Sequence, residues 1–453
     1  MSAPLAALRA AVNPSRVLAD LHALRAIGAV DPAQAGAKGG DGRPKGVCRP
    51  GLSNLDVEAR GWLMHRCAEA GLQPTVDALG TSLCKGSHAS GPRLLAGSHS
   101  DTQPTGGWLD GALGVVYALE AARVLKDAGL PSAIDVVNFQ DEEGRFGTLT
   151  GSSVFCGGAV DWDAVSGAPE AIAPRLTLGE AAEERRRALA ALGAAVAGPG
   201  SEASLLRLDA SAYVGFLEAH IEQGRRLERK GFGCAPVSAL VGLRQLRVTV
   251  TGEQNHAGTT AMADRKDAGA AAIALAHDLE LCFGPAAGLA AIGLAEEAVW
   301  TIGKFDLEPG AASIIAGKAT FVLQFRDPAE GTLDTMAAVV KARAAKAAVE
   351  RGVQIDVKPD RPPLPATPLD PAMHDHVAAA AEACMPGRWE SLHSGALHDA
   401  AALAPHLPST MLFVPSINGI SHTYDEDTSE ADITAGAEVF AVAAARMLGY
   451  VEG

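Results

Sequence analysis

The sequence predicts an α/β protein with two domains: a large domain built on a mainly parallel sheet, and a smaller α+β domain inserted into it. Three observations support this prediction. Residues 94–139 follow a strand–loop–helix–strand pattern, which is typical of a βαβ unit. Beyond Pro236 the pattern changes to alternating strands and Ala-rich helices. The proline-dense stretch Pro362–Pro368 ends that region, and the α/β pattern then resumes.

The length and these boundaries define the predicted domains. A chain of 453 residues is long for one domain, and 48% hydrophobic residues suffice for two cores. We expect residues 1–241 to form the first part of the large domain and residues 364–453 its second part. Residues 242–363 form the predicted inserted domain.

The elements of the large domain follow from apolar periodicity and from residues that cap or break helices. Ser53 or Asn54 is expected to cap the second helix, and Asp31–Lys45 is a Gly- and Ala-rich loop. Helices are predicted at residues 15–30, 55–70, 111–128, 216–229, 372–384 and 430–448. Strands are predicted at residues 74–83, 94–96, 133–139 and 410–414.

The inserted domain combines strands with two helices. Residues 243–251 (LRQLRVTVT) alternate between apolar and polar residues, as a half-exposed strand does. Further strands are predicted at residues 298–305, 318–325 and 353–357, and helices at 267–280 and 332–351. A sheet with helices on one face is the expected result.

The composition excludes several classes of function. A net charge of −15 argues against nucleic acid or an anionic membrane as the partner, because both demand a basic surface. The seven cysteines are scattered and form no CxxC pair, so neither a disulfide framework nor a thiolate metal site is indicated. The N-terminal stretch has no long apolar run typical of a signal peptide or a transmembrane helix. We therefore expect a cytoplasmic protein with reduced thiols.

Polar side chains follow both strands of the βαβ unit. His99 comes after the first strand, Asp110 precedes the helix, and Glu142 and Glu143 come after the second strand. In parallel sheets, ligands collect outside the carboxyl ends of the strands. Histidine and carboxylate without cysteine suit zinc or another divalent ion. The alternative is that Asp110 is a helix cap and that the two glutamates are solvated acids in a turn.

Three further histidines have the same ambiguity. His220, His398 and His422 are each compatible with an ordinary core or surface histidine. Taken together with the acids, they supply the inventory that two metal ions with a bridging carboxylate require. No HExxH motif is present, which excludes a thermolysin-type zinc helix. In the inserted domain, His256 follows a strand in a loop and Arg326 follows another strand. Taken alone, His256 is compatible with an ordinary polar turn and Arg326 with an ordinary surface arginine.

A series of short motifs resembles one known family across nearly the whole chain. The motifs are GSHSDT, GGWLDGALG, QDEEGRFG, EAHIEQG, NHAGTT, SGALHDA and GISH. They are similar to the successive signatures of the hydantoinase/carbamoylase-type amidohydrolases, relatives of the di-zinc exopeptidases. That group includes N-carbamoyl-L-amino acid hydrolases, β-ureidopropionases and allantoate amidohydrolases.

The resemblance implies a fold, a metal centre and roles for single residues. It implies a di-zinc exopeptidase-like catalytic domain and a smaller lid domain that also forms a homodimer. The implied ligands of two divalent ions, zinc with manganese, nickel or cobalt as alternatives, are His99, Asp110 as the bridge, Glu143, His220 and His422. Glu142 would be the general base and His256 would polarise the scissile carbonyl. Arg326 would pair with a substrate carboxylate, while Gln223 and His398 would line the site.

Two positions depart from the family pattern, and both concern substrate recognition. Ser313 stands where the family commonly has asparagine, and a hydroxyl reaches less far than an amide. Leu397 stands where the family has glycine, so a side chain occupies a place where backbone could approach a ligand.

The resulting hypothesis is hydrolysis of an N-carbamoyl group on a small carboxylated substrate. An N-carbamoyl-L-amino acid would give the amino acid, ammonia and carbon dioxide. The alternatives are allantoate, ureidoglycolate or β-ureidopropionate as substrate, or a simple N-acyl amino acid. A metal-dependent binding protein without turnover is the alternative from another class. Glu142 argues against it, since a binding site needs no free carboxylate beside its ligands.

Overall fold

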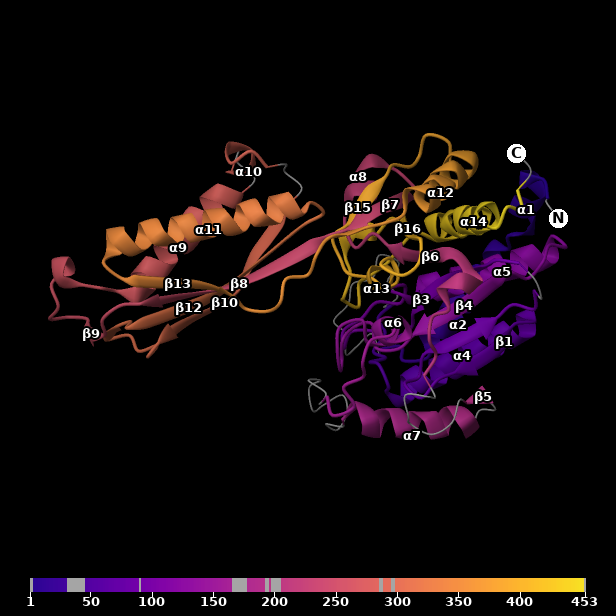
Figure 1. Cartoon of the computed structure of the whole chain (residues 1–453), viewed down its shortest axis with the longest axis horizontal. Coiled ribbons are helices and arrows are strands. Elements are labelled where there is room, and N and C mark those ends of the chain that lie inside the picture. Colours follow the sequence, from indigo (N-terminus) through magenta and orange to yellow (C-terminus); the bar gives the residue numbers. More distant parts are fainter. Residues whose placement is uncertain are drawn as a thin grey trace. The chain divides into compact units, whose positions relative to one another are not determined.

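The computed structural model describes residues 3–30, 45–88, 91–164, 177–191, 195–196, 205–284, 288–294 and 298–451. The chain divides into two compact units: residues 1–238 with 369–453, and residues 239–368 (Figure 1). The predicted domain junctions lie within a few residues of these borders. Apart from Lys45, the predicted loop at 31–45 lies outside the described residues. No described helix is long and apolar enough to cross a membrane.

The first unit is an α/β structure, as predicted. Its helices are α1 Leu5–Ala11, α2 Pro14–Ala26, α4 Asn54–Ala70, α5 Ala112–Asp127, α6 Thr150–Phe155, α7 Leu178–Ala191, α8 Arg226–Lys230, α12 Pro371–Cys384, α13 Ala400–Leu403 and α14 Glu430–Met447, with 3₁₀ turns at Ala210–Ala212 and Ile417–Gly419. Its strands, including two at the border with the second unit, are β1 Gln73–Val76, β2 Ser82–Lys85, β3 Arg93–His99, β4 Ile134–Phe139, β5 Ala195–Val196, β6 Tyr213–Ile221, β7 Ala235–Leu240, β14 Thr367–Pro368, β15 Leu392–Ser394 and β16 Ser409–Val414.

The main sheet has parallel strands at its centre. Among the described residues its order is β14-β7-β16-β6-β3-β4-β2-β1-β5, with β15 beside β7. β16, β6, β3 and β4 run parallel to one another, and antiparallel strands flank them. Loops that follow the central strands therefore meet at one edge of the sheet.

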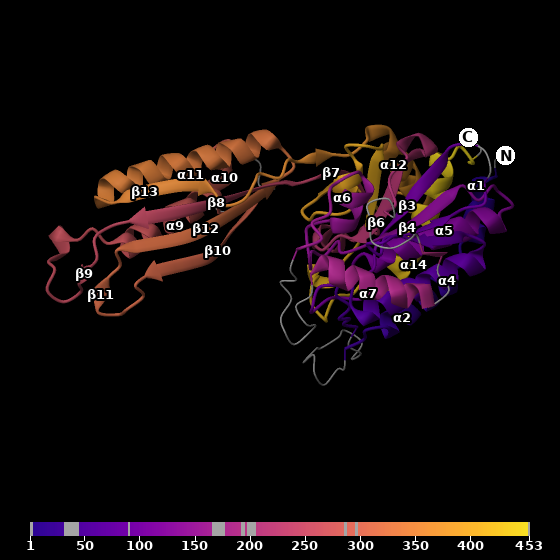
Figure 2. The same ribbon diagram turned by 60° about the horizontal axis from the view of Figure 1, so that its bottom comes forward.

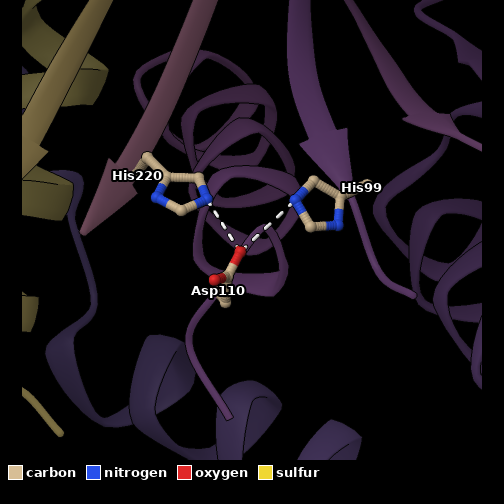
Figure 3. Close-up of side chains that lie close together, drawn as sticks. All are labelled: His99, Asp110 and His220. Carbon is tan, nitrogen blue, oxygen red and sulfur yellow. Dashed lines mark hydrogen bonds and ion pairs between the residues drawn. The ribbon is translucent and has the colours of Figure 1, made fainter. Parts of the chain in front are cut away.

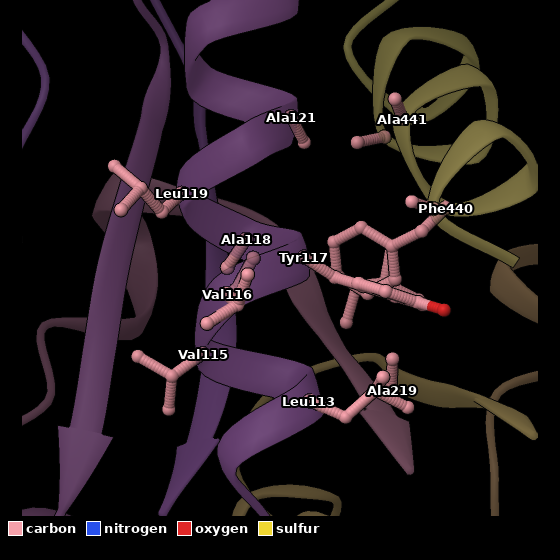
Figure 4. Packing of buried hydrophobic residues seen from close by; sticks show 14 of the residues in the cluster. Leu113, Val115, Val116, Tyr117, Ala118, Leu119, Ala121, Ala219, Phe440 and Ala441 are labelled. Atoms are coloured by element: carbon pink, nitrogen blue, oxygen red, sulfur yellow. The ribbon is translucent and has the colours of Figure 1, made fainter. Parts of the chain in front are cut away.

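The core lies between this sheet and α5 and α14. Every residue of α5 from Ala112 to Leu125 is buried, because the helix has strand residues on one side and other helices on the other. Figure 4 shows Tyr117 of α5 against Phe440 of α14, whose ring centroids are 5.8 Å apart. This packing holds the N-terminal end of α5 in place beside the carboxyl ends of β3 and β6.

Two of the predicted elements are wrong. The predicted strand at 74–83 is two antiparallel strands, β1 and β2, because a turn separates them. The Asp77 carboxylate accepts hydrogen bonds from the backbone N–H groups of Leu79, Gly80 and Thr81 and so closes that turn. The predicted helix at 216–229 is instead the end of strand β6, followed after a short loop by the single-turn helix α8.

The second unit is an antiparallel sheet covered by helices. Its elements are β8 Gly242–Thr251, β9 Asn255–His256, a 3₁₀ turn Met262–Asp264, α9 Ala268–Phe283, α10 Gly288–Ala291, β10 Val299–Glu308, β11 Ile314–Ile315, β12 Lys318–Asp327, α11 Glu330–Arg351 and β13 Gln354–Pro359. The sheet order is β10-β12-β8-β13, and β9 pairs with β11 in a separate ribbon. α9 and α11 pack together on this sheet, as Figures 1 and 2 show. Alternate residues of β8 and β12 face these helices and are buried.

Candidate active site

Side chains of ligand type gather where the central strands of the first unit end. His99 is the last residue of β3, and His220 is the penultimate residue of β6. Asp110 lies in the loop before α5, Glu143 follows β4, and His422 follows β16. Residues from four different parts of the chain thus reach one edge of the sheet.

The Asp110 carboxylate is the centre of this cluster. Its Oδ1 lies 3.0 Å from His220 Nε2 and 3.5 Å from His99 Nε2, and both rings point at it in Figure 3. Its Oδ2 lies 3.2 Å from His422 Nε2, which in turn is 3.7 Å from Glu143 Oε2. Two groups result, His99–Asp110–His220 and Asp110–Glu143–His422, each with ligand atoms within 4.8 Å of one another. Asp110 belongs to both groups.

Backbone contacts orient the two imidazoles of the first group. His99 Nδ1 lies 3.0 Å from the carbonyl oxygen of Asp101, and His220 Nδ1 lies 3.0 Å from that of Ile221. A carbonyl only accepts hydrogen bonds, so each ring donates through Nδ1 and, when neutral, presents Nε2 with its lone pair. Gly111 makes room for this arrangement: it has a φ of +64°, and a Cβ there would lie 2.4 Å from the His99 ring.

The cluster perturbs its own ionisation. Burial would raise the pKa of Asp110, but His220, His422 and His99 outweigh it and hold the pKa well below its usual range. Burial would lower the pKa of His99, but neighbouring carboxylates, Glu142 first, raise it well above its usual value. The hydrogen bond to Asp110 raises the pKa of His422 to about 9. Without a metal ion, these raised pKa values favour protons on His99 and His422, whose positive charges offset the neighbouring carboxylates.

The two adjacent glutamates differ in position. Burial, and then the negative charge of Asp110, raise the pKa of Glu143 to about 7. Burial, followed by the counteracting charge of His99, leaves the pKa of Glu142 well above its usual value. Glu142 Oε2 lies 3.6 Å from His99 Nε2, yet Glu142 belongs to neither ligand group. Imidazole nitrogens and carboxylate oxygens held this close suit divalent ions such as zinc, so the donor set fits a two-ion centre.

Backbone strain also concentrates at this edge of the sheet. Gln223 and His422 each have a φ of about +57°, a region that residues other than glycine rarely adopt. Gln223 Nε2 donates to Asp110 Oδ2 at 2.9 Å. Gln223, expected to line the site, therefore contacts the shared carboxylate directly.

The segment before α13 brings two more predicted residues to the cluster. The ring of the buried His398 lies 4.4 Å from that of His220, and its Nε2 is 2.9 Å from Ser394 Oγ. Burial, and then the charge of His220, lower the pKa of His398 well below its usual value, so this ring stays neutral. Leu397 is half-buried beside it.

The remaining predicted residues belong to the second unit. His256 is exposed on the β9–β11 ribbon, and its Nδ1 accepts from the backbone N–H groups of Gly258 and Thr259 at 3.0 and 3.2 Å. The neutral ring therefore carries its proton on Nε2. The carbonyl of Ser313 accepts from Ala257 N at 3.0 Å, which places it next to His256. Arg326 is half-buried on β12, and its Nε donates to Gln324 Oε1 at 3.1 Å.

Sequence reasoning missed the residues that support the ligands. Gln103 donates to the Glu143 carboxylate from its backbone N at 3.1 Å and from Nε2 at 2.8 Å. Ser421 and Glu426 lie behind Asp110. These side chains sit in loops without periodicity, and no spacing in the sequence separates them from other polar loop residues.

Comparisons with known proteins match the motif resemblance. Residues 95–446 match the model of the Peptidase family M20/M25/M40. The N-carbamoyl-L-amino-acid amidohydrolase of Rhizobium meliloti is 33% identical over 409 residues, which are 89% of this chain and 92% of that protein. The allantoate amidohydrolase of Escherichia coli is 32% identical over 395 residues, 85% of this chain and 89% of that protein.

A solved structure agrees over almost the full length. The hydantoinase/carbamoylase-family amidase from Burkholderia phymatum superposes with a TM-score of 0.82 at 39% identity. The match covers 97% of this chain and 98% of that one.

Proposed function

The chain belongs to the peptidase family M20/M25/M40, as an amidohydrolase of the hydantoinase/carbamoylase group, and we propose that it hydrolyses an N-carbamoyl-L-amino acid to the amino acid, ammonia and carbon dioxide. Water attacks the ureido carbonyl, the bond to the α-nitrogen breaks, and the amine leaves with a proton. The released carbamate decomposes to ammonia and carbon dioxide. Relatives named for different ureido substrates are about equally similar to this chain, at 33% and 32% identity. The identity of the substrate as an N-carbamoyl-L-amino acid is therefore what a substrate panel must test.

The observation that carries this proposal is a largely buried carboxylate, with a side chain 9% exposed, outside both ligand groups. Glu142 lies within 3.6 Å of His99, yet neither group needs it. A largely buried acid with a raised pKa, next to the ligand cluster, suits a general base that takes a proton from water and returns it to the leaving amine. A site that only bound metal would have no use for it.

We assign the two ligand groups to two divalent ions, zinc with manganese, nickel or cobalt as alternatives. Ions bound there would act as Lewis acids toward the carbonyl oxygen and would lower the pKa of the attacking water. Asp110 would hold both ions, because each of its oxygens faces a different group.

Two residues of the second unit are assigned to the substrate. His256 carries its proton on Nε2 and can donate it, as a hydrogen bond, to the carbonyl oxygen on which negative charge develops. Arg326 offers a planar guanidinium, which can pair with the substrate carboxylate through two hydrogen bonds. Ser313, next to His256, and Leu397, next to His398, are assigned to substrate selection.

The first experiment measures ammonia and amino acid release from a panel of substrates. The protein is loaded separately with zinc, manganese, nickel or cobalt and given N-carbamoyl-L-amino acids, allantoate, ureidoglycolate, β-ureidopropionate and N-acetyl amino acids. We expect turnover of the N-carbamoyl-L-amino acids to exceed that of the others. Exclusive cleavage of allantoate or ureidoglycolate would keep the mechanism and refute the substrate.

Variants of Glu142 and Arg326 test the assigned roles. Glu142→Gln should keep its full metal content and lose about 10²–10⁴-fold in kcat, which is the usual contribution of a general base. Unchanged turnover would exclude Glu142 as the base. Arg326→Lys should raise KM for a carboxylated substrate and leave its carboxamide counterpart almost unaffected, because lysine lacks the bidentate fork.

We also propose that the protein is a homodimer through its second unit. Exposed apolar side chains concentrate there: Ile273 and Leu281 of α9 are 58% and 63% exposed, and Val299 of β10 is 56% exposed. Among the described strands, β10 pairs only with β12 and leaves an edge open, and such edges invite pairing with another chain. Light scattering should give twice the chain mass of 46.3 kDa, and Val299→Lys should shift it toward the monomer. A monomeric wild type would refute this assignment.

The predicted cytoplasmic location stays a prediction.

A further inference from the structure

A fourth carboxylate lies behind the shared ligand. The side chain of Glu426 is completely buried, in the loop that follows β16. Its Oε1 accepts hydrogen bonds from the backbone N–H groups of Leu109 and Asp110 at 3.1 and 3.0 Å. The fit is tight, since a Cβ on Gly107 would lie 2.0 Å from the Glu426 carboxyl group. Glu426 therefore holds the main chain at the position from which Asp110 extends.

The other oxygen of Glu426 reaches Asp110 through a serine. Ser421 Oγ lies 2.9 Å from Glu426 Oε2 and 3.2 Å from Asp110 Oδ2. Gln223 Nε2 donates both to this hydroxyl at 3.0 Å and to Asp110 Oδ2 at 2.9 Å. A hydroxyl has a single hydrogen, so Ser421 serves one carboxylate at a time and accepts from Gln223. Because Ser421 directly precedes His422, this contact also ties the second ligand loop to the first.

The neighbouring acid makes different contacts. Asp427 accepts from Trp108 Nε1 at 3.2 Å and forms an ion pair with Lys45 at 2.6 Å. Both acids thus fasten the segment before α5 to the loop after β16, but only Glu426 contacts Asp110 itself. This difference makes Asp427 a matched control for Glu426.

We propose that Glu426 is a positioning residue, which sets Asp110 between the two ligand groups. The proposal rests on the two-ion centre of the proposed function. Asp110 supplies one oxygen to each group, so a small displacement of its backbone moves a ligand of both ions together. The supporting partners of metal ligands commonly contribute in this way, and their loss lowers metal affinity about 10–100-fold.

The test is a metal-competition titration with a chromophoric chelator, combined with the visible spectrum of the cobalt-loaded protein. Glu426→Ala should weaken the binding of both ions about 10–100-fold and change the cobalt spectrum, since two buried N–H groups lose their acceptor. Glu426→Gln should bind within about threefold of wild type. Its carbonyl can accept from both N–H groups and its amide can donate to Ser421, which leaves the serine hydrogen for Asp110. Asp427→Asn should match wild type.

Three outcomes would overturn the proposal. The first is native metal affinity and a native cobalt spectrum in Glu426→Ala. The second is a loss of metal affinity in Glu426→Gln as large as in Glu426→Ala, which would make the charge rather than the hydrogen-bond acceptor decisive, and the third is an equally large loss of affinity in Asp427→Asn. If Glu426→Ala does not fold, Ser421→Ala decides: it removes the link between Glu426 and Asp110 Oδ2 and should weaken metal binding, and native affinity in that variant would overturn the proposal. These readouts require no turnover, so failure on the substrate panel and failure of this proposal are distinguishable.

Discussion

Replacing the buried Arg60 of α4 by methionine is expected to destabilise the first unit by about 3–5 kcal/mol, which is the usual cost of removing one partner of a buried ion pair. The side chain of Arg60 is only 1% exposed. Its Nε donates to Asp56 Oδ1 at 2.9 Å, and its Nη atoms donate to the carbonyls of Asn138 and Phe139 at 2.9 and 2.8 Å. Its Nη2 also lies 3.6 Å from Oδ1 of Asp101, which follows the candidate ligand His99 in the sequence.

Methionine keeps much of the volume and the helix propensity of arginine, so the loss is mainly electrostatic. Asp56 and Asp101 would remain buried with Arg49 as their remaining neighbouring cation, and the two carbonyls at the end of β4 would lose the hydrogen bonds that Arg60 donates. Tryptophan fluorescence reports on the unfolding of this unit, because Trp62, Trp108, Trp162 and Trp389 lie in it and only Trp300 lies in the other.

The expected fall in Tm is roughly 6–10 °C, since one kcal/mol shifts a domain of this size by about 2 °C. Arg187→Met is the control, because the Arg187–Glu183 pair is solvent-exposed and contributes at most about 0.5 kcal/mol. A Tm for Arg60→Met within about 2 °C of wild type would refute the reasoning. An equal effect of both variants would do the same.

Three further predictions concern the proposed metal site. Gly111→Ala should abolish tight metal binding while the circular dichroism spectrum stays native, because the new Cβ would lie 2.4 Å from the His99 ring. A normal metal content, measured by plasma emission spectroscopy, would contradict this prediction. Chelation should lower the Tm of the loaded protein, since an ion at 100 times its Kd stabilises by about 2.7 kcal/mol; an unchanged Tm would mean that the ions do not bind the folded state. Metal affinity should rise with pH up to about 9, because in the ion-free protein the hydrogen bond to Asp110 raises the pKa of His422 to about that value, and a protonated imidazole cannot be a ligand. Because the pKa of His422 is raised, its charge pair with Asp110 stabilises the ion-free fold at low pH, and this stabilisation is lost as the pH rises through about 9. Calorimetric metal affinities that stay flat from pH 7 to 9 would contradict the assignment of His422 as a ligand.

The α/β class and the parallel centre of the sheet could be predicted because the βαβ unit has clear periodicity. β6 could not be read this way. Its residues are buried on both faces, so apolar and polar residues do not alternate, and Glu218 and His220 interrupt the apolar run with buried polar groups. The apolar positions that remained were compatible with helical spacing. Only the pairing of β6 with β3 and β16 reveals the strand.

The candidate ligands could be named from the sequence because the motif resemblance covers them, and the structure brings all five to one sheet edge. Their supports could not be named. Glu426 acts on Asp110 through backbone N–H groups, and a backbone contact leaves no pattern of residue types. Gln103 is a similar case, since one of its three hydrogen bonds with Glu143 comes from its own main chain.

The position of β16 in the main sheet has a consequence for biosynthesis. β16 lies between β6 and β7, although more than 160 residues, including the whole second unit, separate it from them along the chain. A nascent chain therefore lacks the strand that belongs between β6 and β7 until β16 has been made. The contacts of β16 with these strands join residues far apart in the sequence, and such contacts slow folding. His422 follows β16, so the chain cannot assemble the complete set of candidate ligands until the segment after β16 has been synthesised. Loading of the proposed metal ions would then have to follow the synthesis of β16, and a chain terminated before β16 would display an open sheet to chaperones and proteases.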